Sequence, residues 1–164
     1  MKDFLFKIKD YVIIVVVVII IRTFIITPAL VDGASMNNTL KDGQLVIINK
    51  FTYLFNEPKR FDIVVVKNKD SRDKIIKRII GLPNEKIVYK DNNLYINGEL
   101  YKENFVLGNT TDYEFKTGDD EYFVLGDNRP VSKDSRLLGS FKKKDLIGKV
   151  NLRLFPFNKI GKVK

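Results

Sequence analysis

The sequence predicts a mainly β domain that follows one apolar N-terminal helix. Two observations predict this fold class. Short β-branched or aromatic runs recur between residues 44 and 155, separated by Gly, Pro, Asn and Asp. No long amphipathic stretch with helical periodicity appears after residue 30. We therefore expect a coiled, barrel-like antiparallel β-sheet over residues 28–164, with a smaller, hairpin-rich insertion at residues 83–121.

The first element is an apolar run over residues 11–26, interrupted only by Arg22 and Thr23. With its apolar neighbours, the run is long enough to cross a hydrocarbon core of about 30 Å. We expect residues 1–27 to form a cytoplasmic tip and one transmembrane helix. Lysines at positions 2, 7 and 9 precede the run. The positive-inside rule then places the N-terminus in the cytoplasm and the domain outside the cell membrane.

Two other interpretations of this run compete with the anchor. A cleavable signal peptide needs small residues at its end, and Thr27-Pro28-Ala29 is a poor cleavage site. A buried core segment is the other alternative, although ten consecutive Val and Ile residues at positions 12–21 are unusual in so small a domain. A retained anchor is the interpretation that both observations favour.

The expected strands follow in chain order and are separated by turn residues. They are QLVIINK, FDIVVVK, KIIKRII, EKIVYK, NLYING, EYFVLG and KVNLRLF. Asn97-Gly98 predicts a two-residue hairpin turn. The stretch KFTYLF at residues 50–55 is aromatic and basic. It is either a packed strand end or a contact with the lipid interface.

Composition limits the chemistry that the chain can perform. There is no cysteine and no histidine, so disulfides and thiolate chemistry are excluded, and zinc lacks its usual ligands. We expect no cofactor and no metal. The net charge of +9 suits nucleic acid, an anionic membrane or an acidic partner. The charges are spread along the chain except at residues 142–144, so we expect no nucleic-acid partner.

A serine in the turn GASMNNTL, residues 33–40, is the first candidate for catalysis. A serine hydroxyl is a poor nucleophile until a base removes its proton, and the usual histidine is absent. Carboxylates or a lysine are the remaining bases. A lysine with its reference pKa of about 10.4 is almost entirely charged at neutral pH, so it must be desolvated to act as a base.

The segment KIIKRIIGLP offers such a lysine. In a strand, Ile75 and Ile79 share one face with Lys77 and would desolvate it. The same argument applies to Arg78, so alternation alone does not select between them. The alternative is an edge strand protected by its charges. The loop GDNRPVSKDSR, residues 126–136, reads by itself as a solvated loop with Asx turns, and its spacing does not fit a calcium site.

Taken together, these segments resemble the type I signal peptidases, membrane-bound Ser-Lys endopeptidases, in their compact Gram-positive-like form. The resemblance covers nearly the whole chain, in the order anchor, GASMNNTL, DGQLVIINK, FDIVVVK, KIIKRIIGLP and GDNRPVSKDSR. Each segment is weak evidence alone. The combination of KRIIGLP and GDNRPVSKDSR after an anchor and a Ser-Met turn is highly specific.

The resemblance implies a role for each matching position. Ser35 matches the nucleophile, Lys77 the general base, and Ser132 the serine that orients the lysine. Four further residues match positions that hold the site together, namely Arg78, Asp127, Asp134 and Arg136. Gly33 stands where some members carry a serine that helps the oxyanion hole, so the hole would rest mainly on backbone N–H groups. Asn38 stands where the family usually has Pro, which would stiffen the turn.

The implied function is removal of N-terminal signal peptides from secretory preproteins by a Ser-Lys dyad through an acyl-enzyme, with small residues before the cut. Partners would be preproteins and membrane lipid. A dedicated or non-catalytic factor for one secretion or surface-assembly route is the alternative. A repressor-type autoprotease shares the dyad, but it needs a DNA-binding domain where this chain has its apolar run.

Overall fold

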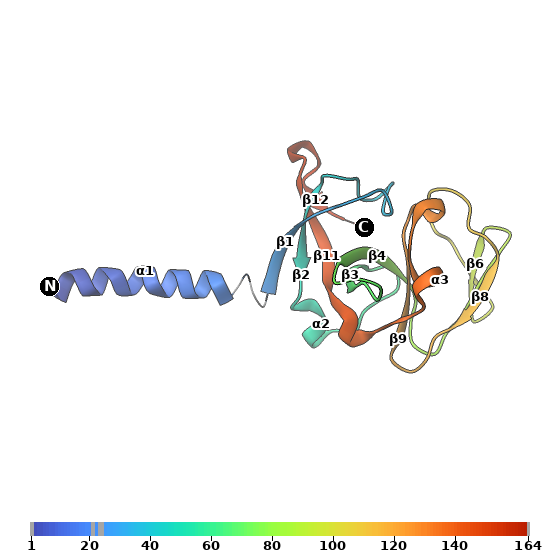
Figure 1. The fold of residues 1–164 in the computed structure, drawn as a ribbon, viewed down its shortest axis with the longest axis horizontal. Helices are drawn as coiled ribbons and strands as arrows, with labels where there is room; N and C mark the ends of the chain where they lie inside the picture. The colour runs from blue at the N-terminus through green and yellow to red at the C-terminus, as the bar shows by residue number, and fades with distance from the viewer. Residues whose placement is uncertain (1, 21, 23–24, 164) are drawn as a thin grey trace.

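The computed structural model describes residues 2–20, 22 and 25–163. Helix α1 (Lys2–Ile20) extends away from a body built of strands (Figure 1). Within these described residues, no helix is both long and apolar enough to cross a membrane. The expected transmembrane helix is therefore not confirmed. Residues 1, 21, 23 and 24 of the expected anchor lie outside the described part, and its last two residues, 26 and 27, belong to strand β1.

The body of the protein is one large curled antiparallel sheet. Its order is β1-β2-β11-β3-β4-β9-β10, and β12 pairs with β11. The strands are β1 (Ile26–Leu30), β2 (Leu45–Asn49), β3 (Ile63–Lys67), β4 (Lys74–Gly81), β9 (Glu121–Leu125), β10 (Phe141–Lys142), β11 (Leu146–Phe155) and β12 (Gly161–Lys162). The mainly β, coiled antiparallel fold expected from the sequence is confirmed.

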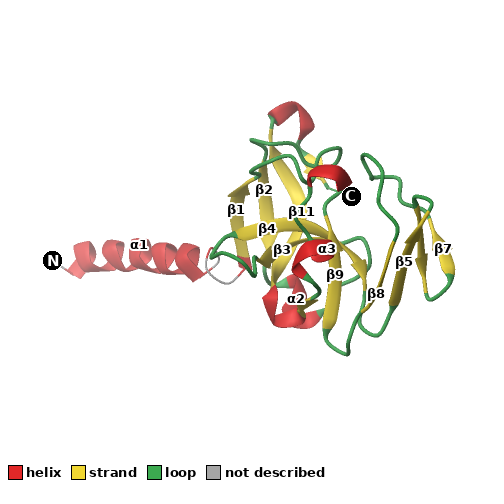
Figure 2. Ribbon diagram, turned by 45° about the vertical axis from the view of Figure 1, so that its right-hand side comes forward, coloured by secondary structure: helices red, strands yellow, loops and turns green. Residues whose placement is uncertain are grey.

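A second, four-stranded antiparallel sheet is inserted between β4 and β9, in the order β7-β6-β5-β8 (Figure 2). Its strands are β5 (Lys86–Lys90), β6 (Asn93–Ile96), β7 (Glu99–Tyr101) and β8 (Tyr113–Lys116). The expected hairpin turn joins β6 to β7, with φ of 50° at Asn97 and 89° at Gly98. These positive values at both central residues match the turn that Asn-Gly favours. The limits 83–121 for the insertion stay a prediction.

Strand β3 lies in the middle of the large sheet, and its run of apolar residues is buried on both faces. Ile63 and Val65 belong to one cluster with residues of β2, while Val64 and Val66 belong to a second cluster with residues of β9. Successive side chains of a strand point to opposite faces, so a continuous apolar run suits a strand covered on both sides. A third apolar cluster joins the C-terminal end of β4 to the four-stranded sheet.

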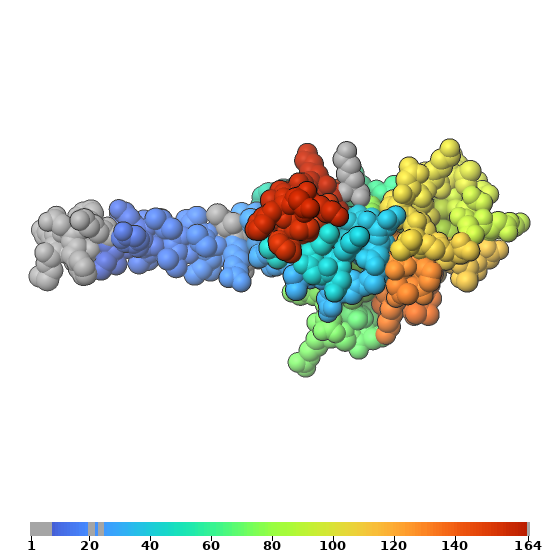
Figure 3. All heavy atoms as spheres, turned by 90° about the horizontal axis from the view of Figure 1, so that it is seen from above, coloured from blue at the N-terminus to red at the C-terminus, as the bar shows by residue number. Residues whose placement is uncertain are grey.

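Short helices and the C-terminal hairpin complete the body. Helix α2 (Thr52–Phe55) follows β2, and α3 (Ser135–Leu138) follows the loop after β9. After β11, the 3-10 turn η4 (Phe157–Lys159) leads back into β12. Seen from above, this C-terminal segment (red) lies against the segment around residue 40 (blue to cyan) (Figure 3). A hydrogen bond from Arg153 Nη1 to the Thr39 carbonyl oxygen (3.3 Å) joins the two.

Candidate active site

The turn that carries Ser35 is fixed by the core beneath it. Met36 and Leu40 are 1% and 0% exposed and pack in the cluster that includes β2 and β3. Burying two such side chains contributes about 1.5–3 kcal/mol each. Backbone hydrogen bonds, among them the Leu40 N–H to the Met36 carbonyl (2.8 Å), close the turn. Ser35 itself is half-buried, between exposed Ala34 and buried Met36.

Two residues of this turn have the left-handed backbone conformation. Gly33 and Asn38 both have φ of 86°. Glycine adopts this conformation without strain, and the Gly33 N–H donates to Asp42 Oδ1 (2.8 Å). Asparagine is one of the few other residues that tolerate it. A proline ring fixes φ near −65°, so the proline that the sequence resemblance led us to expect does not fit the backbone at position 38.

Lys77 lies in the middle of β4 and reaches the serine. Its Nζ donates to Ser35 Oγ at 2.7 Å, and the residue is 3% exposed. Burial lowers the pKa of Lys77 to about 8, although the carboxylates of Asp134 and Asp127 oppose part of this shift. Near that pH about half of the lysine is neutral, and a neutral amine at this distance can accept the Ser35 proton.

Arg78 comes next on the strand and is held by a carboxylate. Its Nε and Nη2 donate to the two oxygens of Asp127, at 2.9 and 2.7 Å, and both side chains are almost completely buried. The Thr39 hydroxyl also donates to Asp127 and accepts from Arg78 Nη2. This network links β4, the loop after β9 and the turn of Ser35.

A second ion pair shapes the loop after β9. Asp134 is fully buried and caps α3, where Oδ1 accepts from the Arg136 N–H (3.2 Å). Its carboxylate also accepts from Arg136 Nε and Nη2, and from the Gly126 N–H (3.1 Å). Arg136 Nη2 in turn donates to the carbonyls of Arg129 and Ser132. These hydrogen bonds fold the loop on itself.

Ser132 is buried beside the dyad but does not bond to the lysine in this structure. Its Oγ has no hydrogen-bond partner among the described residues. A Cβ at Gly126 would collide with this Oγ and would lie 2.5 Å from the Ser35 carbonyl oxygen. Glycine at position 126 therefore lets the backbone of Ser35 and the side chain of Ser132 approach each other.

Sequence reasoning missed Asn128, which supports the serine turn directly. Its backbone N–H donates to the Ser35 carbonyl (3.0 Å), and its Nδ2 donates to the Ala34 carbonyl (3.1 Å). The partners are more than 90 residues apart, so no local pattern points to this contact. No acceptor for the Ser35 N–H is found among the described residues, which leaves this donor available to a ligand.

A second missed residue is Arg129, which ties the inserted sheet to the site. It is 1% exposed and donates to Tyr89 Oη (2.7 Å), Glu103 Oε1 (2.7 Å) and Thr110 Oγ1 (3.1 Å). Its Nε donates to the Gly126 carbonyl (3.1 Å). The three nitrogens of one guanidinium thus join three segments of the insertion to the loop that holds Asn128. The polar density of GDNRP was the only signal in the sequence.

A cleft of about 260 Å³ runs beside Ser35 and Lys77. Residues 30–33, 35 and 36, which follow β1, and residues 74–77 of β4 form its walls, together with Asn68 and Asp73. β9 pairs with β4 only from Arg78 onward, so residues 74–77 present an open strand edge on that side. An open edge of this kind can pair with an extended peptide.

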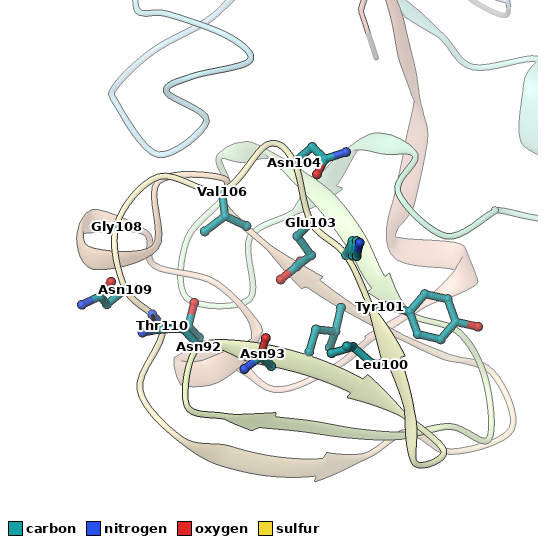
Figure 4. A pocket seen from close by; sticks show the side chains of 12 residues that line it. Asn92, Asn93, Leu100, Tyr101, Glu103, Asn104, Val106, Gly108, Asn109 and Thr110 are labelled. Carbon is teal, nitrogen blue, oxygen red and sulfur yellow. Dashed lines mark hydrogen bonds between the residues drawn. The ribbon is translucent and has the colours of Figure 1, made fainter.

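Another pocket, of about 370 Å³, lies in the insertion and is lined by residues 92–94, 100–104, 106 and 108–110 (Figure 4). Its one carboxylate, Glu103, is already paired with Arg129, and it has no serine among its lining residues. Among the described residues, no three His, Cys, Asp or Glu side chains are grouped so that they could hold a metal ion. The Ser35–Lys77 cleft is therefore the candidate for catalysis.

Comparison with known proteins agrees with this geometry. Residues 6–155 match the family model described as signal peptidase, peptidase S26. The chain belongs to this family. Signal peptidase I P of Bacillus subtilis subsp. natto is 38% identical over 96% of this chain and 92% of its own length. The resemblance drawn from the motifs is thus confirmed, and the family is one of peptidases.

Further relatives carry the same name. Signal peptidase IB of Staphylococcus aureus is 34% identical over 96% of this chain and 92% of its own length. A crystal structure of a signal peptidase I from Enterococcus faecalis is 35% identical and superimposes with a TM-score of 0.53, covering 57% of this chain and 97% of that one. The similarity therefore extends to the fold of the body.

Proposed function

We propose that this protein is a signal peptidase that cleaves signal peptides from exported preproteins with a Ser35–Lys77 dyad. The observation that carries the proposal is the 2.7 Å contact between Lys77 Nζ and Ser35 Oγ, made by a lysine that is almost completely buried. The names of the relatives supply the substrate class. The same contact argues against the alternative of a non-catalytic factor, which has no need of a desolvated lysine.

Catalysis begins when neutral Lys77 removes the proton from Ser35. The serine oxygen then attacks the scissile carbonyl, and the Ser35 N–H, which has no acceptor among the described residues, stabilises the oxyanion. One such donor is worth about 10²–10³ in rate in other serine hydrolases. Protonated Lys77 next gives its proton to the leaving amine, which leaves an acyl-enzyme. A water activated by the same lysine hydrolyses that ester.

The cleft explains how a peptide is presented to the serine. An extended peptide fits between residues 30–33 and the open edge of residues 74–77, where it would pair as an added strand. The volume of about 260 Å³ is small, which favours small side chains next to the cut. Leu30, Val31 and Ile76 contribute apolar walls.

We also propose that residues 1–27 attach the protein to the cell membrane, with the N-terminus in the cytoplasm and the catalytic domain outside. The support is the surface of α1, where each side chain from Tyr11 to Ile19 is at least 46% exposed. An apolar helix surface of this size is unfavourable in water and suits lipid. Tethering raises the effective concentration of the site at the membrane surface. Protease accessibility of the domain in intact spheroplasts would test this orientation.

The function is tested with the purified full chain in detergent and a preprotein that carries an Ala-x-Ala site. We expect the parent to release the mature protein, and Ser35→Ala and Lys77→Met to lose at least about 10³-fold in rate. Lys67→Met, which removes an exposed lysine from neighbouring β3, is the matched control and should keep full activity.

Two other results of this assay would contradict parts of the proposal. Cleavage that survives Lys77→Met would show that another group is the base. A folded parent that cleaves none of several preproteins would contradict a general signal peptidase and support a dedicated or non-catalytic factor.

A further inference from the structure

A hollow of about 510 Å³ lies between the end of the Ser35 turn and the C-terminal hairpin. Eight of its ten described lining residues are polar. The lining residues are Asn38, Thr39, Lys41, Gln44, Asn104, Phe105, Arg153, Lys159, Lys162 and Val163. Two of its walls are the segment around residue 40 and the C-terminal hairpin, which lie side by side in the view from above (Figure 3). The Ser35–Lys77 cleft shares none of these residues, so the hollow is a separate feature.

The charge of this hollow is entirely positive. Lys41, Arg153, Lys159 and Lys162 face it, and none of the lining residues that the structure describes is acidic. Moreover, none of these four cations forms an ion pair with a carboxylate in the described part of the chain. Like charges gathered around a concave surface focus a positive potential and attract anions.

Arg153 is held in place by neutral groups alone. Its Nε donates to the Lys159 carbonyl (2.9 Å), and its Nη1 donates to the Thr39 carbonyl and to Gln44 Oε1, each at 3.3 Å. Its Nη2 makes no hydrogen bond to a described residue. The guanidinium is thus oriented in advance while its charge stays uncompensated. Such a fork binds the oxygens of a multivalent oxyanion well.

We propose that this hollow is a binding site for a phosphate-bearing anion, either a free phosphate compound or the headgroup of an anionic phospholipid. The three lysines supply mobile point charges, Arg153 supplies a fixed fork, and the amides of Asn38 and Asn104 supply further donors. The volume exceeds what one carboxylate would need. The proposal does not depend on the peptidase activity.

Exposed apolar side chains next to the hollow are the reason to consider a phospholipid headgroup as its ligand. Phe157 and Ile160, on either side of Lys159, are 79% and 55% exposed. Acyl chains attached to a phosphate in the hollow would find apolar contacts there. Cations beside exposed apolar side chains are the combination that binds anionic lipid surfaces.

Binding is tested by calorimetric titration of the full chain in an uncharged detergent. The probes are inorganic pyrophosphate, dihexanoyl phosphatidylglycerol and, as the uncharged lipid control, dihexanoyl phosphatidylcholine. The hollow variant is Lys41→Gln with Lys159→Gln and Lys162→Gln. The matched control is Lys90→Gln with Lys116→Gln and Lys144→Gln, which removes three equally exposed lysines elsewhere and lowers the net charge equally.

We expect the parent and the matched control to bind alike, and the hollow variant to bind about 100-fold more weakly, a factor of about five for each lysine. Pyrophosphate binding lost in the hollow variant assigns the site to free phosphate compounds. Binding of phosphatidylglycerol alone, lost in the same variant, assigns it to lipid headgroups.

Three results would overturn the proposal. The first is a parent that binds neither anionic probe, and the second is an equal loss of affinity in the two triple variants. The third is binding of a glutamate-rich peptide without binding of either phosphate probe, which would assign the hollow to acidic protein segments. Equal melting temperatures and equal cleavage rates for the parent and the hollow variant are the check on folding.

Discussion

Two neighbouring cations on β4 are both almost completely buried, yet they have opposite environments. Arg78 is paired with both oxygens of Asp127 and also lies 3.9 Å over the Phe105 ring. Lys77 donates to the Ser35 hydroxyl, and no described carboxylate accepts a hydrogen bond from it. A buried charge with a hydrogen-bonded partner stays charged, whereas a buried amine without one loses its proton more easily. One strand thus provides a structural cation and a candidate base at adjacent positions.

The largest expected effect comes from breaking the Arg78 pair. Asp127→Ala leaves a guanidinium buried without its carboxylate and removes a partner of Thr39, so we expect the free energy of unfolding to fall by about 3–5 kcal/mol. Chemical denaturation of the full chain in detergent measures this. The double variant Arg78→Met with Asp127→Leu removes both charges and should lose less. If Asp127→Ala were as stable as the parent, the Arg78–Asp127 pair would contribute no more to stability than an ion pair at the surface.

The pH dependence of cleavage measures the other side of the comparison. Since the base must be neutral and burial lowers the pKa of Lys77 to about 8, we expect kcat/KM to rise about tenfold per pH unit below pH 8 and to level off above it. Between pH 6 and the plateau, the rate should rise about 100-fold. A profile that is flat from pH 6 to pH 9 would contradict a titrating Lys77, provided that the fold is intact throughout.

The smallest expected effect comes from Lys77→Met. This change should raise the free energy of unfolding, whereas Asp127→Ala should lower it. Because the folded-state pKa of Lys77 lies below that of the unfolded chain, burying its charge costs stability at pH values below about 8, and this cost disappears as the pH rises from there toward 10.5. We therefore expect Lys77→Met to gain about 1–3 kcal/mol near pH 6 and progressively less above pH 8. Denaturation at several pH values tests this, and a gain that grows with pH would be inconsistent with it.

Some of the secondary-structure elements could be predicted from the sequence, and others could not. The strands of the large sheet were predictable where β-branched residues are concentrated, as in IVVV of β3 and the two Ile-Ile pairs of β4. Strand β1 was not, because ITPAL contains a proline and follows the apolar run without a turn signal. The four-residue helices α2 and α3 are too short to show a helical period.

The site itself divides in a similar way. Alternation could not separate Lys77 from Arg78, because what distinguishes them is Asp127, which lies 49 residues away from Arg78. The resemblance made that distinction, and the structure brings all the residues it indicated to one place, although Ser132 makes no bond to the lysine here. Asn128 was missed, since its partners Ala34 and Ser35 lie more than 90 residues away in the sequence.

The backbone at Asn38 also limits how this sequence can evolve. With φ at 86°, the position is open to asparagine, aspartate and glycine and closed to most other residues. Proline at this position would need φ near −65°, which this turn does not provide. At position 38, therefore, the backbone itself restricts which residues can be exchanged without strain.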